Sequence, residues 1–186
     1  MEWLPELQVG WLNGWMMLVI FYLVFILLMF LFPRDVVAKL FDRSGWSRQQ
    51  RLLSALGIPF VLGFWLVAIF TSLKIGHPVF IIGLVIYVVG FGGMITALLN
   101  YKNTPVDQPV TEGLYRVSRN PQWVSLVAMF VGTGIAIGSW LALLLFAIGV
   151  GFYHFRILGE EKSCLARYGE PYREYLKRIP RYFLVL

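Results

Sequence analysis

Four long stretches of this chain contain no charged residue, and they constrain its fold more than any other feature. They run from Leu7 to Pro33, from Leu52 to Leu73, from Ile75 to Tyr101 and from Asn120 to Phe155. A helix that crosses the hydrocarbon core of a bilayer needs about 20 residues, so each of the first three stretches holds one span. The fourth is too long for one span and tight for two full ones, which predicts a close helical hairpin that turns near residues 137–140.

The sequence therefore predicts an all-α integral membrane protein with five transmembrane helices, at roughly 12–32, 53–73, 79–100, 121–137 and 140–158. The composition agrees, with 59% hydrophobic and only 14% charged residues, because soluble domains have about 45–50% apolar and about 25% charged residues. We expect a single membrane domain over residues 1–186. Its first part, 1–101, holds three spans and a basic loop, and its second part, 102–186, holds the hairpin and the tail.

The basic residues predict the orientation of the chain. With five spans, every Lys and Arg except Lys74 falls on one side of the membrane. The positive-inside rule then places the N-terminus outside and the C-terminus in the cytoplasm. We accordingly attribute the net charge of +6 to cytoplasmic loops that meet anionic lipid, and not to binding of nucleic acid.

The segment between the third and fourth spans is rich in polar residues and contains a helix start. Pro105 and Pro109 forbid a long helix before it. The Asn120–Pro121 pair predicts the start of the fourth span, since Asn is a favoured N-cap and Pro fits the first turn. The free N–H groups of a helix start attract anions, and Arg116 and Arg119 add positive charge beside them. A plain helix cap with snorkelling arginines is the alternative interpretation.

A second polar segment follows the fifth span. Arg156 and Glu160 are four residues apart and share a helix face, which suits either a site or a surface ion pair worth a few tenths of a kcal/mol. The Tyr168–Pro171 sequence predicts a helix end and then a short amphipathic helix along the membrane. That helix would place Tyr172 and Tyr175 on one face and could simply anchor the tail.

Together the two segments resemble the isoprenylcysteine carboxyl methyltransferase family, whose pattern is shared by phospholipid N-methyltransferases and related bacterial membrane methyltransferases. Residues 115–123, Tyr-Arg-Val-Ser-Arg-Asn-Pro-Gln-Trp, are similar to the family's Tyr-x-x-x-Arg-His-Pro-x-Tyr. Residues 156–161 and 168–175 fit its later Arg-x-x-x-Glu-Glu and Tyr-Gly-x-x-Tyr-x-x-Tyr steps. The resemblance covers about 102–183, which makes 102–186 the expected methyltransferase motif region. Asn120 replaces the family's His, so a mechanism that uses this position as a base is not expected here.

The resemblance implies S-adenosylmethionine as the methyl donor and a cytoplasmic pocket for it. Arg156 and Glu160 carry the catalytic roles, and Arg156, together with His154, is expected to face the methyl acceptor. The residues that the resemblance assigns to the cofactor are Asp107, Gln108, Pro109, Val110, Tyr115, Asn120, Pro121, Gln122, Trp123 and Glu160. No Cys/His cluster suggests a metal site.

The predicted function is methylation of a lipid or lipophilic acceptor, such as an isoprenylcysteine-like carboxylate or a phospholipid amine, in a bacterial or archaeal cytoplasmic membrane. An amine acceptor needs a base, for which Glu160, Glu161 and His154 are candidates. The basic first loop with Trp46 could bind anionic headgroups, which favours a lipid acceptor. Two alternatives stay open: a small-thiol S-methyltransferase, and a non-catalytic membrane assembly or interaction protein.

Overall fold

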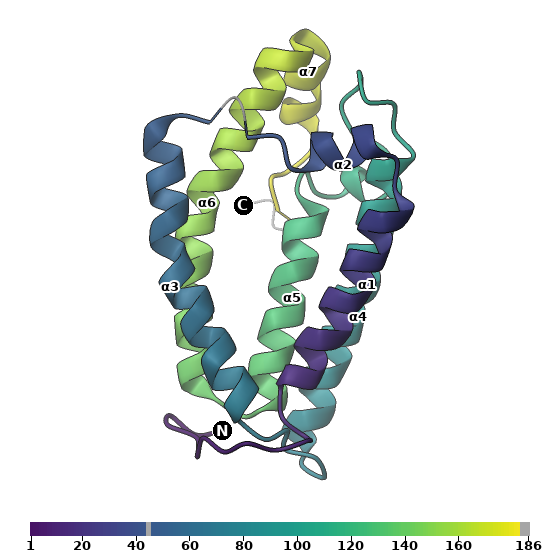
Figure 1. Cartoon of the computed structure of the whole chain (residues 1–186). Helices are drawn as coiled ribbons and strands as arrows, with labels where there is room; N and C mark the ends of the chain where they lie inside the picture. Colours follow the sequence, from purple (N-terminus) through teal and green to yellow (C-terminus); the bar gives the residue numbers. More distant parts are fainter. Residues whose placement is uncertain (44–45, 183–186) are drawn as a thin grey trace.

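Helices account for all of the regular structure in the computed structural model, which describes residues 1–43 and 46–182. The five longest run up and down through the molecule (Figure 1). In chain order, the helices are α1 (Trp15–Leu31), α2 (Arg34–Leu40), α3 (Arg48–Phe70), α4 (Pro78–Lys102), the short 3₁₀ helix η1 (Gly113–Arg116), α5 (Pro121–Ala136), α6 (Trp140–Tyr168) and α7 (Glu170–Arg178).

Each predicted span corresponds to one helix, although the lengths differ. Three helices, α3, α4 and α6, have 23, 25 and 29 residues and are long and apolar enough to cross a membrane. The apolar helices α1 and α5 are shorter, with 17 and 16 residues. Helix α6 continues beyond the predicted span to Tyr168, where the sequence predicts a helix end, and the short helix α7 follows it, as predicted. The predicted turn near 137–140 lies between α5 and α6, where Gly138 has a φ of +70° that suits glycine.

The long helices form two close pairs, because α4 packs along α5 and α3 packs along α6. The first pair meets through glycines: a Cβ atom on Gly132 would lie only 2.6 Å from the carbonyl oxygen of Gly83. The second pair uses Gly57 and Gly149, whose missing side chains leave room for Phe152 and Val61. Small residues of this kind let helix backbones approach closely inside a bilayer.

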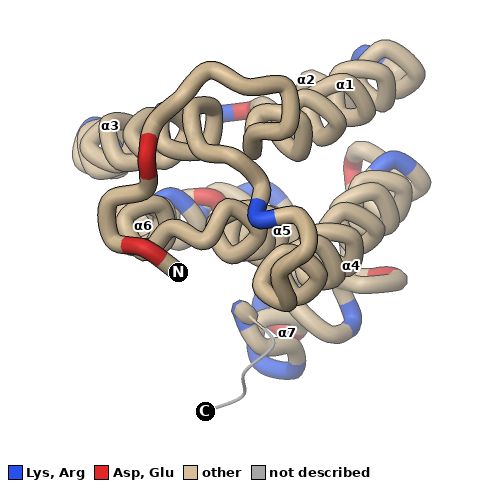
Figure 2. Tube along the Cα trace, turned by 90° about the horizontal axis from the view of Figure 1, so that it is seen from below, with Lys and Arg blue, Asp and Glu red and all other residues tan. Residues whose placement is uncertain are grey.

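The bundle has two different ends, which we call the N-terminal end and the basic end. At the N-terminal end, residues 1–14 run across the helix ends, and the backbone N–H of Glu2 donates to the carbonyl of Gly138 at 2.7 Å. The basic end carries α2, the 103–119 segment and α7. Figure 2, drawn from the N-terminal side, shows helices that are tan for most of their length, with charged segments mainly near their ends. The charges therefore leave a long apolar middle region.

Candidate active site

A cavity of about 810 Å³ lies between the α3–α6 pair and helices α1, α4 and α5. Its deeper part is apolar and mostly aromatic. The side chains that line this part include Phe21, Tyr22, Phe25, Val61, Trp65, Leu126, Phe130 and Phe146. A long apolar wall of this kind suits a hydrocarbon chain better than a small polar ligand.

Toward the basic end the same cavity becomes polar. Charged and polar side chains from α2, η1, the start of α5, the end of α6 and α7 meet there: Lys39, Asp42, Tyr115, Arg119, Asn120, Gln122, Arg156, Glu160, Glu161 and Tyr172. One continuous cavity thus joins a polar site to an apolar chamber.

The start of α5 forms one wall of the polar part. The helix begins at Pro121, as predicted, with Asn120 at the N-cap position. The predicted side-chain cap is wrong, because the Asn120 side chain makes no cap hydrogen bond. Its Nδ2 instead donates to the carbonyl of Arg181 at 3.3 Å, and the backbone N–H of Arg119 donates to the carbonyl of Pro180 at 2.9 Å. The first N–H groups of α5 consequently have no side-chain cap and can meet an anion.

Glu161 is the buried carboxylate of the site and binds two arginines. Arg181 contacts both of its oxygens, with Nε to Oε1 at 3.0 Å and Nη2 to Oε2 at 2.8 Å. Arg119 adds a longer ion pair, with Nη1 at 3.5 Å from Oε1. The neighbouring Glu161 carboxylate raises the pKa of Arg181. A carboxylate held by two cations makes a poor base, so this geometry disfavours Glu161 in the role of a catalytic base.

Arg156 lies between aromatic rings and pairs with Glu160. Its Nε donates to Glu160 Oε1 at 2.8 Å, as the spacing of four residues predicted. The guanidinium carbon is 5.2 Å from the ring centre of Trp46 and 5.3 Å from that of Tyr153, and Tyr153 stacks on Trp123 with ring centres 4.6 Å apart. These rings fix the orientation of the guanidinium at the point where the polar and apolar parts of the cavity meet.

Within residues 1–43 and 46–182, four buried N–H donors that line this cavity find no hydrogen-bond partner: Trp46 Nε1, Trp65 Nε1, Arg119 Nε and Gln122 Nε2. Two other unpartnered polar atoms, Ser54 Oγ and Thr71 Oγ1, belong to residues outside the cavity lining. A buried donor left without a partner costs about 1–3 kcal/mol. Unpartnered donors gathered on one cavity indicate a ligand that accepts hydrogen bonds.

The structure brings most of the expected site residues together. Pro109, Val110, Tyr115, Asn120, Gln122, Trp123, Arg156 and Glu160 all line the cavity. Pro121 is buried behind them in the first turn of α5.

Three expected residues lie elsewhere. Asp107 and Gln108 line a second cavity of about 750 Å³. Pro109 lines both cavities. The imidazole Nδ1 of His154 is 2.9 Å from the hydroxyl of Tyr182, and His154 is not part of the cavity lining. Arg116 also points away, since it pairs with Glu112 at 2.6 Å on the surface.

Sequence reasoning missed several residues that the fold places in the site. Trp46 is 6% exposed and sits inside the cavity rather than on a headgroup-facing loop. Tyr172 and Tyr175 are buried against the cavity instead of lying along a membrane, and the Tyr175 hydroxyl donates to the carbonyl of Tyr115 at 2.7 Å. Burial raises the pKa of Tyr175, so this phenol remains a donor. The Tyr-x-x-Tyr spacing places both side chains on one face of α7, and this spacing was the sequence signal that could have identified the inward face.

The sequence of this chain matches one family model and is similar to known methyltransferases. The family model described as phospholipid methyltransferase matches residues 55–170, which extends the resemblance back into α3 and α4, beyond the segment expected from the motifs. A protein-S-isoprenylcysteine O-methyltransferase of Schizosaccharomyces pombe is 32% identical over 72 residues, which are 38% of this chain and 30% of that protein. Protein-S-isoprenylcysteine O-methyltransferase B of Arabidopsis thaliana is 30% identical over 90 residues, 48% of this chain and 46% of that protein. The chain thus spans less than half the length of these two relatives.

Proposed function

Because this chain belongs to the phospholipid methyltransferase family, we propose that it transfers a methyl group from S-adenosylmethionine to a lipid or lipophilic acceptor. Methyltransferases of this family use S-adenosylmethionine, and the chain is a multi-pass integral membrane protein. One observation carries the proposal: a single cavity joins the family's motif residues to an apolar chamber.

We propose that all five apolar helices cross the membrane as one domain over residues 1–186. The shorter α1 and α5 continue into extended or turn residues that are themselves apolar or small, and a thinner local bilayer accommodates short spans. The charge distribution supports a cytoplasmic basic end, with the N-terminus outside. The cofactor is charged and therefore water-soluble, so it enters the site from the cytoplasm.

The residues at the basic end fit the charged groups of the cofactor. Its carboxylate suits the uncapped start of α5 and the unpartnered Arg119 Nε and Gln122 Nε2 donors. Glu160 suits the cofactor's ammonium or ribose hydroxyls, and the indole of Trp123 suits the adenine ring or the sulfonium. When bound, S-adenosylmethionine supplies an electrophilic methyl group on its sulfonium. Pro109 and Val110 close the same pocket from the loop side.

Arg156 is the residue we assign to the acceptor. It lies where the polar part meets the apolar chamber, so it can orient the reacting group of a molecule whose chain fills that chamber. The rings of Trp46 and Tyr153 cover the guanidinium, while the Arg156–Glu160 pair stays partly exposed. For an amine acceptor, Glu160 is the better placed base, since it lines the cavity and pairs with one arginine, whereas Glu161 binds two arginines and His154 bonds Tyr182.

The size and lining of the cavity favour a lipophilic acceptor over a small thiol. The polar part and the chamber together enclose about 810 Å³, in the upper part of the range of roughly 300–1,000 Å³ typical of ligand pockets, and the chamber is lined by apolar and aromatic side chains. A prenylated cysteine carboxylate and a phospholipid amine both match its polar end and its apolar wall.

Binding of S-adenosylmethionine to the purified protein in nanodiscs, followed by calorimetry, tests the proposal. We expect Glu160→Gln to weaken binding by about tenfold, or about 1.4 kcal/mol. Glu174→Gln is the matched control, because Glu174 is exposed on α7 and pairs with Lys177. Turnover is then measured with a prenylcysteine analogue, phosphatidylethanolamine and a small thiol as alternative acceptors.

Binding that Glu160→Gln weakens and Glu174→Gln leaves unchanged supports the methyltransferase. Absence of binding in several detergents and in nanodiscs would favour a non-catalytic membrane protein. If only the small thiol is methylated, the proposal of a lipophilic acceptor is wrong.

A further inference from the structure

Lys39 of α2 reaches the active-site cavity from a part of the chain that the family match does not include. Its Nζ donates to two backbone carbonyls, that of Gln108 at 2.9 Å and that of Pro105 at 3.3 Å. The same Nζ lies 5.4 Å from the ring centre of Tyr101 and 5.6 Å from that of Tyr168. One ammonium group therefore contacts α4, α6 and the loop that joins α4 to η1.

That loop, residues 103–112, which we call the proline loop, provides the Pro109 and Val110 side chains of the cofactor pocket. It is not helical, and residues 105–108 are exposed. Its prolines lack N–H groups, so they accept hydrogen bonds but donate none through the backbone. Besides Lys39, the Tyr168 hydroxyl holds it through a longer bond of 3.4 Å to the carbonyl of Val106.

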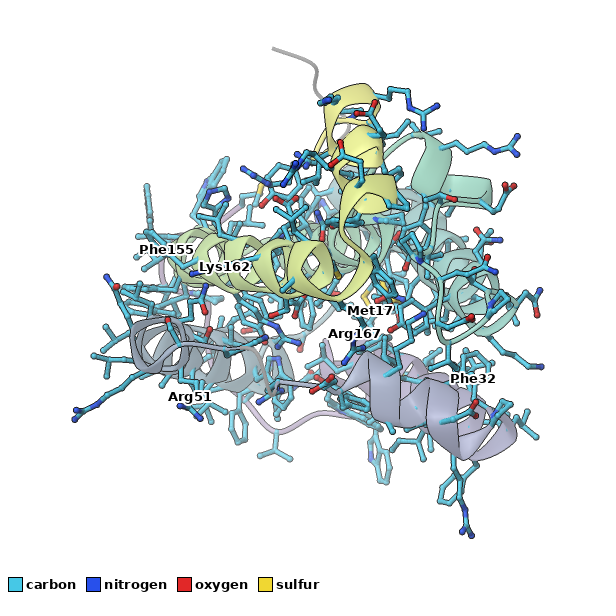
Figure 3. The ribbon with its side chains drawn as sticks, turned by 90° about the horizontal axis from the view of Figure 1, so that it is seen from above. Met17, Phe32, Arg51, Phe155, Lys162 and Arg167 are labelled. Carbon is cyan, nitrogen blue, oxygen red and sulfur yellow. The ribbon has the colours of Figure 1, made fainter. Side chains whose placement is uncertain are left out.

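The surroundings of Lys39 restrict the side chain. Burial lowers the pKa of Lys39, which agrees with an ammonium that has exchanged water for carbonyls and aromatic faces. Asp42, three residues later, forms an ion pair with Arg167 on α6. In Figure 3, which looks onto the basic end, Arg167 lies between α6 and the α1–α2 segment. The connection after α1 is thus fixed to α6 at a second point.

We infer that Lys39 is a positioning residue that holds the proline loop in the conformation needed to bind the cofactor. Lys39 acts through the backbone of residues 105–108, which directly precede Pro109 and Val110. Its two carbonyl bonds set the loop's distance from α2, and the Tyr101 and Tyr168 rings keep the ammonium centred between α4 and α6. The inference rests on the proposed function only for the identity of the cofactor.

The experiment compares Lys39→Met, Lys39→Arg and the control Lys102→Met. Lys102 lies at the end of α4, next to the proline loop, but its Nζ is over the ring of Phe32. Hydrogen exchange of residues 103–112 is measured without cofactor, and S-adenosylmethionine affinity, KM and kcat are measured with it. We expect Lys39→Met to speed exchange in the loop and to raise Kd and KM by about tenfold, with a smaller change in kcat. Lys39→Arg, which keeps the charge and the donors, recovers part of the loss, and Lys102→Met matches the wild type.

Unchanged exchange and unchanged affinity in Lys39→Met would overturn the inference, and so would an equal effect of Lys102→Met. If the wild type does not bind S-adenosylmethionine, the proposed function fails, while the exchange measurement still decides the role of Lys39. If Lys39→Met does not fold, Tyr168→Leu and Tyr168→Phe replace it. Both changes remove the hydroxyl bond to Val106, and only Tyr168→Leu also removes the ring that faces the Lys39 ammonium. Faster loop exchange in Tyr168→Leu than in Tyr168→Phe supports the inference, and equal exchange in the two variants overturns it.

Discussion

The N-terminal end and the basic end of the bundle differ in whether their buried polar groups have hydrogen-bond partners. At the N-terminal end, the side chain of Asn13 is 1% exposed and donates to the carbonyls of Gln8 and Ile69 at 2.7 and 3.0 Å. Ser139 caps α6 by accepting from the N–H of Ala142 at 3.1 Å. Beside them lies a closed apolar cluster that includes Phe64, Ile137 and Ala142, each 0% exposed.

At the basic end, Arg119 Nε, Gln122 Nε2 and Trp46 Nε1 are buried without partners around a cavity. Thr71 Oγ1 is an unpartnered atom at the N-terminal end, but no described cavity includes Thr71. We infer that one end of the bundle contributes stability, whereas the other contains unsatisfied donors that a ligand can satisfy. Substitutions at the two ends should therefore separate stability from activity.

The largest expected effect is on turnover, at the basic end. Arg156→Ala removes the group that we propose orients the acceptor, so we expect kcat/KM to fall by at least about 100-fold, or about 2.7 kcal/mol. The free energy of unfolding should change by less than about 1 kcal/mol, because the Arg156–Glu160 pair is partly exposed. Radiolabelled methyl transfer and thermal unfolding measure the two quantities. Full turnover in this variant would remove Arg156 from the site.

The second largest effect is on stability, at the α4–α5 glycine contact. Gly83→Val places atoms within 2.5 Å of the carbonyl oxygen of Gly132, which should cost at least about 1–3 kcal/mol of unfolding free energy by overpacking. Gly92→Ala is the control on the same helix, since no atom lies within 4 Å of its added Cβ. Denaturation in detergent with both variants tests the contact, and equal stability of the two variants would contradict it.

A matched pair of leucine substitutions tests whether buried polar groups at the two ends differ in their contribution to stability. Asn13→Leu leaves two carbonyls without their donor and should cost about 1–3 kcal/mol of stability. Gln122→Leu removes a buried Nε2 that has no partner among the described residues, so it should not lower the unfolding free energy and should raise it by up to about 1–3 kcal/mol. The Gln122 variant should instead lose affinity for S-adenosylmethionine. If Gln122→Leu proves as destabilising as Asn13→Leu, the two ends do not differ as described.

The smallest effect is expected for Tyr175→Phe. This change removes only the hydroxyl that donates to the carbonyl of Tyr115 at 2.7 Å, a bond worth about 0.5–1.5 kcal/mol. Because Tyr175 also lines the cavity, a modest rise in KM should accompany the loss of stability. Thermal unfolding beside steady-state kinetics checks this, and a gain in stability would contradict the assignment.

The arrangement of long helices could be predicted from sequence because a bilayer imposes a simple rule on charge. Charge-free stretches located five helices and the turn at Gly138. The same rule does not give the length of α6, since a charge marks the membrane surface and not the end of a helix. The Tyr168–Pro171 sequence predicted that end, and α6 does end at Tyr168. Residues such as Arg156, Glu160 and Lys162 are good helix formers in water.

The site could be predicted where its residues are close in sequence or belong to the two motif segments that the family resemblance joins. Arg156 and Glu160 lie on adjacent turns, and their pairing followed from that spacing. The partner of Asn120 is the carbonyl of Arg181, 61 residues away, so no local rule for helix caps could have identified it. Lys39 and Trp46 likewise reach the cavity through tertiary packing alone, and their spacing in the sequence carries no signal for this.

The continuous cavity also has a consequence for inhibition. The polar pocket and the aromatic chamber share one wall of residues from α5 and α6, without a partition between them. A single molecule with a nucleoside-like head and an aliphatic tail, joined at the level of Arg156, would fill both parts at once. Such a bisubstrate compound gains from effective concentration, since binding of one half makes binding of the other intramolecular.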